Sequence, residues 1–192
     1  MADTVASVTV GETPVAGLPG TTSGVKVLAL DWGHTLMDER RDRDIPLDAR
    51  PAHLMPGVRE ALGAMTLPLA VWANTREGDE RHVRAWLTRA GLGGVFSWVI
   101  TSTDAGARKP SPRFFSYALA RCGCSSDDVL FVGNQLNTDV AGANAVCIRS
   151  VWLAGDAYRS DDDRPCDAVP THTIESLADL PALVGRIVEG RQ

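Results

Sequence analysis

One aspartate, Asp31, stands where a short apolar run gives way to small and polar residues. The run at residues 25–30 reads Val-Lys-Val-Leu-Ala-Leu, and Asp-Trp-Gly-His-Thr follows it. An apolar run of this length, bounded by turn residues, is typical of a buried parallel strand. Open α/β sheets bind their ligands beyond the carboxyl ends of such strands. Asp31 is therefore a candidate nucleophile or cation ligand, and the alternative is an aspartate that only caps a turn.

Three later segments carry polar residues of types that bind phosphate or a metal. Two of these segments directly follow further apolar runs, at residues 70–73 and 129–133. The third contains a lysine directly before an expected helix start. Because parallel strands end at the same edge of a sheet, we expect these residues to lie near Asp31. They are Asn74 and Thr75 after the first run, Lys109 before the helix, and Asn134 followed by Asp139 after the second run.

An aspartate, a small polar group, a lysine and a carboxylate in this order resemble the motifs of the haloacid dehalogenase-like (HAD) hydrolase superfamily. The resemblance covers roughly residues 25–188. It implies that Asp31 attacks phosphorus and becomes an aspartyl phosphate, while Lys109 holds the phosphate and the carboxylate together. It also implies a Mg²⁺ site, which is weak because an asparagine replaces one acid. The implied metal ligands are Asp31, the carbonyl group of Gly33, Asn134 and Asp139.

Two further positions depart from the pattern of the family. Family phosphatases carry a second aspartate, their general acid and base, where this chain has Gly33. Loss of such a group typically costs about 10²- to 10⁴-fold in rate, and His34 is the nearest titratable candidate to replace it. Ala73 stands where a Thr or Ser usually binds the phosphoryl group. Thr75 or the backbone of Asn74 would have to supply that hydrogen bond.

Strand and helix patterns alternate along the chain with short links. This alternation predicts a three-layer α/β fold with a doubly wound, Rossmann-like parallel sheet, and the resemblance adds the strand order 5-4-1-2-3. We expect strands at residues 25–30, 67–73, 95–100, 129–132 and 147–152, and helices that begin near residues 57, 79, 112, 138 and 180, the last capped by Asp179.

Only residues 36–55 separate the first strand from the next helix. They suffice for a hairpin flap but are too few for a helical cap domain, so we expect an open active site without a sizeable cap. The charged block at residues 38–44 has mixed signs, which is typical of a solvated loop.

The composition fits one globular domain. The chain has 192 residues, of which 44% are hydrophobic, and we expect a domain over residues 24–192 after a flexible tail at residues 1–23. The net charge of -5 gives no sign of a nucleic-acid-binding face. No run reaches the roughly 18 apolar residues of a membrane span, and no signal peptide is recognisable, so we expect a cytoplasmic protein.

Three functions remain open from the sequence. The first is a HAD-type hydrolase that takes the phosphoryl group from a phosphate ester or acyl phosphate of a small molecule or macromolecule, with a site that a neighbour in a homo-oligomer could cover. The second is a pseudo-enzyme that serves as a binding or scaffold module, as the losses at Gly33, Ala73 and Asn134 suggest. The third is carbon–halogen or other non-phosphoryl hydrolysis, because family dehalogenases share two of these departures, although they use a cap.

Overall fold

The computed structural model describes residues 24–190 apart from 43, 77 and 162–163. The tail expected at residues 1–23 lies outside the described residues. The described chain forms one six-stranded sheet in which all neighbouring strands are parallel, in the order β3-β2-β1-β4-β5-β6. The strands are β1 (Val27–Leu30), β2 (Leu69–Ala73), β3 (Trp98–Thr101), β4 (Val129–Gly133), β5 (Arg149–Leu153) and β6 (His172–Ile174).

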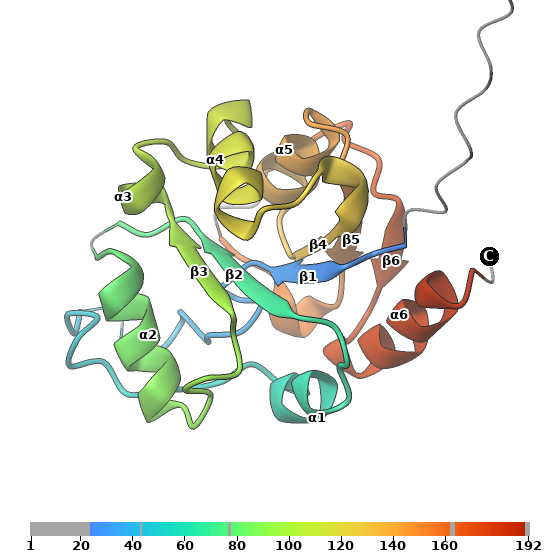
Figure 1. Ribbon diagram of the computed structural model, residues 1–192. Coiled ribbons are helices and arrows are strands. Elements are labelled where there is room, and N and C mark those ends of the chain that lie inside the picture. Colours follow the sequence, from blue (N-terminus) through green and yellow to red (C-terminus); the bar gives the residue numbers. More distant parts are fainter. Residues whose placement is uncertain (1–23, 43, 77, 162–163, 191–192) are drawn as a thin grey trace, which may run out of the picture.

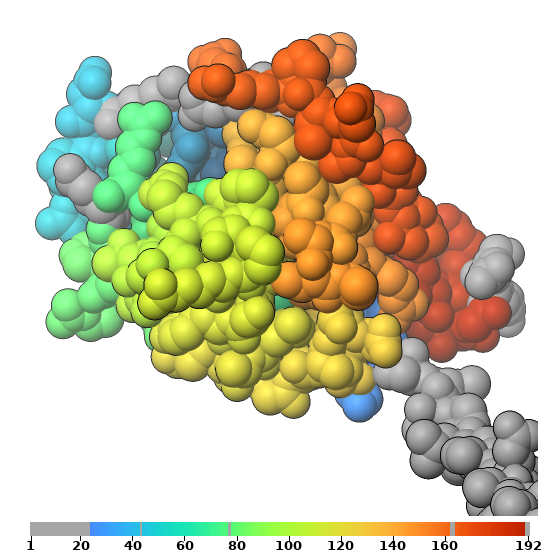
Figure 2. Space-filling model, turned by 90° about the horizontal axis from the view of Figure 1, so that it is seen from above, coloured from blue at the N-terminus to red at the C-terminus, as the bar shows by residue number. Residues whose placement is uncertain are grey.

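Helices cover both faces of this sheet (Figure 1). Helices α1, α2 and α6 pack on one face, and α3, α4 and α5 pack on the other, which Figure 2 views from outside. The predicted three-layer α/β fold is therefore confirmed. The helices are α1 (Val58–Gly63), α2 (Glu80–Arg89), α3 (Ser102–Ala105), α4 (Pro112–Cys122), α5 (Ala141–Asn144) and α6 (Leu180–Val188).

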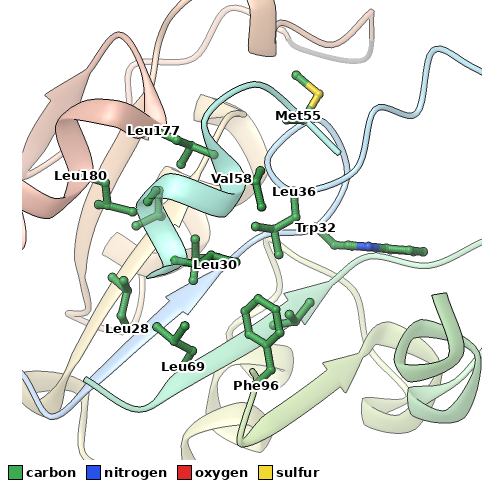
Figure 3. Close-up of a cluster of buried hydrophobic side chains, with 14 of the residues drawn as sticks. Leu28, Leu30, Trp32, Leu36, Met55, Val58, Leu69, Phe96, Leu177 and Leu180 are labelled. Atoms are coloured by element: carbon green, nitrogen blue, oxygen red, sulfur yellow. The ribbon is translucent and has the colours of Figure 1, made fainter. Parts of the chain in front are cut away.

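The central strand β1 carries side chains to both layers of helices. Leu28 and Leu30 belong to the core cluster under α1, α2 and α6 (Figure 3), whereas Val27 and Ala29 belong to the cluster under α4. All residues of β1, β2 and β4 are buried. Burial on both faces explains why these strands read as continuous apolar runs, and each leucine stabilises the fold by about 1.5–3 kcal/mol.

The predicted strand order is confirmed, with β6 as an addition at the edge. β6 pairs with β5 in parallel and was not predicted. Its three residues follow a long irregular segment, and so short a strand carries little periodic signal.

Two local predictions were wrong. The third strand begins at Trp98 instead of Val95, because the Val95 amide bonds back to the carbonyl group of Leu92 in a turn. The Asp179 side chain makes no cap bond to α6 and instead accepts a hydrogen bond from the Ser176 amide at 3.1 Å, which closes the turn before the helix.

Residues 37–55, which we call the flap segment, leave the sheet after β1 and return before α1. An antiparallel bridge between Met37 and Leu54 closes the base of the segment, and the Asp38 amide bonds to the His53 carbonyl oxygen at 2.9 Å. Among its described residues, all but 43, the segment contains turns and no helix. No large cap is present over the sheet within the described chain. None of the described helices combines the length and apolar character needed to cross a membrane.

Candidate active site

Asp31 follows β1 directly at the carboxyl edge of the sheet. Its amide bonds to the Val132 carbonyl oxygen of β4 at 2.8 Å, so neighbouring backbone fixes where its side chain begins. Its Oδ1 accepts a hydrogen bond from the Lys109 ammonium group at 2.5 Å, and its Oδ2 accepts one from the Thr35 hydroxyl group at 3.3 Å. Both carboxylate oxygens are therefore oriented by buried donors.

Lys109 reaches Asp31 from the loop between α3 and α4. The side chain of Asn74, at the end of β2, holds the lysine backbone at two points: its Oδ1 accepts from the Lys109 amide at 2.9 Å and its Nδ2 donates to the Lys109 carbonyl at 3.0 Å. Only 1% of the Lys109 side chain is exposed. Burial alone would lower the pKa of Lys109, but the Asp139 and Asp31 carboxylates outweigh burial and raise it.

Asp139 is the second partner of Lys109, at 2.7 Å from its ammonium nitrogen. The Gln135 amide donates to the other oxygen of the carboxylate at 3.0 Å. The carboxylate lies so close to β4 that a Cβ on Gly133 would be 2.4 Å from its Cγ, so only glycine fits at that strand end. Burial raises the pKa of Asp139 to about 6, with Asp31 adding to the effect and Lys109 opposing it.

Asn134 is also part of the site, because its Oδ1 accepts a hydrogen bond from the Thr35 hydroxyl group at 3.4 Å. Its Nδ2 donates to the Tyr158 carbonyl oxygen at 2.7 Å, which leaves the amide oxygen directed toward the Thr35 hydroxyl group. The structure therefore brings together Asp31, Lys109, Asn134 and Asp139, as the order of the motifs predicts, and it adds Thr35 between two of them.

Thr75 and Ala73 lie at the end of β2. The Thr75 amide donates to the Ser102 hydroxyl group at 3.0 Å, and the Thr75 hydroxyl donates to the Gly78 carbonyl oxygen at 2.8 Å. Asn74 and Thr75 both line the cleft described below. The side chain of Asn74 is the anchor of Lys109, and a phosphate contact of either residue stays a prediction.

The turn after Asp31 places three residues near the mouth of the site. His34 adopts the left-handed conformation (φ 56°) and is buried. Its Nε2 lies 4.0 Å from a carboxylate oxygen of Glu39, which comes from the flap segment. Gly33, between Asp31 and His34, is partly exposed. A proton-transfer role for His34 stays a prediction.

A cleft of about 510 Å³ opens over Asp31. Its walls come from the β1 turn, the flap segment, the end of β2 and the loops before α4 and α5. In Figure 2 a recess with blue atoms of the early chain lies between cyan flap residues and orange residues that follow β5. The charged and polar lining includes Asp31, Glu39, Asp44, Arg50, Arg76 and Arg108.

Comparison with known proteins finds relatives of this chain. The family model described as HAD-hydrolase-like matches residues 106–180. The haloacid dehalogenase-like hydrolase domain-containing protein 3 of Danio rerio is 36% identical over 104 residues, which are 54% of this chain and 41% of the relative. The glyceraldehyde 3-phosphate phosphatase of Methanopyrus kandleri is 29% identical over 130 residues, 67% of this chain and 51% of the relative. The chain thus spans about half the length, or less, of these curated relatives.

Solved structures share the fold. An uncharacterized protein from Listeria monocytogenes serotype 4b superimposes with a TM-score of 0.72 at 24% identity, covering 86% of this chain and 99% of that one. The HAD-hydrolase YfnB of Bacillus subtilis, bound to magnesium, gives 0.67 at 16% identity, covering 84% and 99%. The family match over residues 106–180, the strand order and the motif residues at the strand ends agree with one another. They make the chain similar to hydrolases of the HAD superfamily.

HAD hydrolases generally use Mg²⁺, and the oxygen donors of this chain fit that ion. Asp31 Oδ2 and Asn134 Oδ1 are the side-chain oxygens that would bind the ion. Both lie within 3.4 Å of the Thr35 hydroxyl oxygen. Mg²⁺ needs only one or two carboxylates because it usually keeps several waters. Among the described residues no group of three His, Cys, Asp or Glu side chains is placed to hold a metal, so the donor set carries little charge.

Thr35, Glu39 and Asp44 belong to this site and were not predicted. Thr35 lies four residues after Asp31 and is close to it because the chain turns back sharply there. Glu39 belongs to the charged block expected to be a solvated loop, yet it and Asp44 line the cleft. A block of charges of both signs does not reveal which of its residues faces inward. Glu39 can therefore be assigned to the site only once the path of the flap segment is known.

Proposed function

We propose that this chain is a phosphohydrolase that takes the phosphoryl group of a phosphate ester or acyl phosphate onto Asp31. The observation that carries the proposal is the buried Lys109 ammonium group, held between Asp31 and Asp139 beneath an accessible cleft. A fixed cation beside a carboxylate lowers the cost of bringing that carboxylate to an anionic phosphate. Several relatives that match the chain are named phosphatases.

The reaction has two displacements at phosphorus. In the first, an oxygen of Asp31 forms a bond to phosphorus while the bond to the leaving oxygen breaks. In the second, water attacks phosphorus, the bond to Asp31 breaks, and inorganic phosphate leaves. Lys109 balances the charge of the phosphoryl group in both steps, and Asn74 keeps the lysine in place through its two backbone bonds.

A bound Mg²⁺ would supply further charge neutralisation between the two anions. The residues that would hold it are Asp31, the carbonyl group of Gly33 and Asn134. Asp139 faces the Lys109 ammonium group and would act on the metal site mainly through that lysine.

The substrate we propose is a phosphorylated compound small enough for a cleft of about 510 Å³, without a nucleic-acid or membrane partner. The arginines that line the cleft favour an anionic substrate. The cytoplasmic location, the homo-oligomer and the alternative of a phosphorylated macromolecule stay expectations.

The test of this proposal is covalent labelling. Acetyl phosphate and Mg²⁺ should add one phosphoryl group to the intact protein, as seen by mass after a brief acid quench. Asp31→Asn should abolish both the label and turnover, because it keeps the shape of the side chain and removes the nucleophilic charge. Turnover by Asp31→Asn at the rate of the parent would contradict the proposal.

A pseudo-enzyme is the second candidate, and two observations favour it. Position 33 has no side chain, and the metal donor set has lost one charge at Asn134. A chain that keeps the fold as a binding module would bind neither Mg²⁺ nor acetyl phosphate productively. Absence of both label and turnover in the parent, with Mg²⁺ present, would favour this candidate.

A further inference from the structure

We propose that Glu39, from the flap segment, is the proton donor and acceptor of this site in place of a side chain at position 33. The inference rests on the proposed phosphohydrolase function and deepens it. It explains how a chain with glycine two residues after its nucleophile can still protonate a leaving group and activate water.

Glu39 occupies the space that Gly33 leaves empty. A Cβ on Gly33 would lie 2.7 Å from the carboxylate carbon of Glu39 and 2.8 and 2.9 Å from its two oxygens. These distances are shorter than real Cβ contacts, so a side chain at position 33 and the Glu39 carboxylate compete for one place. The backbone of Gly33 is not left-handed, and the close atoms are the end of a flexible side chain, so a side chain at position 33 would displace the Glu39 carboxylate from this place.

The turn after β1 brings Glu39 to this place. The Trp32 carbonyl oxygen accepts hydrogen bonds from the amides of Leu36 and Met37, both at 2.8 Å, and Gly33 forms a bridge with Met37. The chain therefore folds back on itself, and the flap segment starts alongside Gly33. This path places the carboxylate of Glu39 against the turn that follows Asp31.

The surroundings of Glu39 suit proton transfer. Its side chain is 37% exposed and lines the same cleft as Asp31, so its protons can exchange with water and with a bound substrate. His34 Nε2 lies 4.0 Å from one of its oxygens. At that distance the imidazole forms an ion pair with the carboxylate only when the imidazole is protonated.

The proton balance closes over the two displacements. While Asp31 bonds to phosphorus and the leaving oxygen departs, the protonated Glu39 gives that oxygen its proton and becomes a carboxylate. In the second step water passes a proton to this carboxylate as its oxygen attacks phosphorus. The bond to Asp31 breaks, inorganic phosphate leaves, and Glu39 is protonated again.

The test separates formation from decay of the phosphoryl label on the intact protein. In Glu39→Gln, acetyl phosphate should still label Asp31 at the rate of the parent, because a good leaving group needs no proton. Decay of the label should slow by about 10²-fold or more, because the general base is missing. Labelling by glycerol phosphate, a poor leaving group, should fall by a similar factor.

Asp48→Asn is the matched control, since Asp48 is an exposed acid of the flap segment that does not line the cleft. It should change neither rate. A rescue gives the sharper control: Gly33→Asp in a Glu39→Ala background, which frees the space beside Gly33, returns a carboxylate to that space and should shorten the life of the label again. A purely structural role of Glu39 would predict no such rescue.

The outcomes distinguish the two proposals. Absence of both label and turnover in the parent protein, with Mg²⁺ present, would overturn the phosphohydrolase function itself, and the role of Glu39 with it. A label that decays equally fast in the parent and in Glu39→Gln would overturn only the role of Glu39. Slow decay in His34→Gln with normal decay in Glu39→Gln would assign the base to the histidine and would also overturn it.

Discussion

Lys109 makes two ion pairs at once, with Asp31 at 2.5 Å and with Asp139 at 2.7 Å, while 1% of its side chain is exposed. A buried ion pair is weak support for stability, because desolvation of the charges offsets most of their attraction. Breaking such a pair from one side costs about 3–5 kcal/mol. The charges of Lys109, Asp31 and Asp139 are therefore better explained by a function at the cleft than by a contribution to the stability of the fold.

Asn134 stabilises the fold through its amide group, but it gives the metal site less charge than an aspartate would. Asn134→Asp should tighten Mg²⁺, because it adds a full charge next to Asp31. It should also lower the stability of the metal-free protein by about 1–3 kcal/mol, because the Tyr158 carbonyl oxygen loses its donor. Calorimetric titration with Mg²⁺ and thermal unfolding without it measure the two effects.

Asn144→Asp is the control for this pair of effects. The Asn144 side chain also donates to a carbonyl oxygen, that of Val169, at 2.9 Å, but outside the cleft. Its replacement should leave Mg²⁺ affinity unchanged. Equal Mg²⁺ affinity in the parent and in Asn134→Asp would contradict the proposed ligand set.

At the scale of elements, α2 depends on its N-terminal cap. The Asp79 carboxylate accepts hydrogen bonds from the Arg81 amide at 3.0 Å and from the Arg81 and His82 side chains. These hydrogen bonds lower the pKa of Asp79. Because the folded pKa lies below its ordinary value of 3.8, the contribution of Asp79 to stability is present above about pH 4 and is lost as the pH falls.

Asp79→Ala should therefore lower the midpoint of thermal unfolding at pH 7 by about 2–4 °C. The difference from the parent should shrink as the pH is lowered below 4. Asp79→Asn keeps an acceptor for the amide and should lie closer to the parent at pH 7. A difference between Asp79→Ala and the parent that is independent of pH would show that the charge of Asp79 does not act through the cap.

The elements that the sequence predicts well are those whose pattern is fixed by burial. Residues 25–30 and 129–133 read as buried strands because both of their faces pack under helices, and parallel strand ends then bring Asp31 to Asn134. Lys109 follows from the same topology, since its loop precedes a helix at that edge. The edge strand β6 and the start of β3 carry no such periodic signal and were not predicted correctly.

The contacts that escape prediction depend on the path of irregular chain. Glu39 meets Gly33 only because the flap segment doubles back through a bridge at Met37, and no spacing rule encodes that turn. The same holds for the Asn74 side chain, which binds the backbone of a residue 35 positions away. Sequence patterns predict which strand ends meet, and they do not predict which loop side chains fill the space between those ends.

At the scale of the whole molecule, the cleft lies over the carboxyl edge of the sheet, and the flap segment forms one of its walls. A phosphate mimic that binds the native protein and not the unfolded chain must raise the unfolding midpoint. Beryllofluoride with Mg²⁺ is such a mimic for a phosphorylated aspartate. At a hundredfold excess over its Kd it should add about 2.7 kcal/mol of stability.

For a chain of this size that free energy corresponds to a rise of about 5–10 °C in the midpoint. The rise should be absent in Asp31→Asn, because beryllofluoride needs the carboxylate, and it should persist in Asp48→Asn, which keeps it. An equal rise in Asp31→Asn would place the mimic on the arginines of the cleft instead. No rise in the parent, under conditions where calorimetry shows Mg²⁺ to bind, would contradict the assignment of Asp31 as the residue that accepts the phosphoryl group.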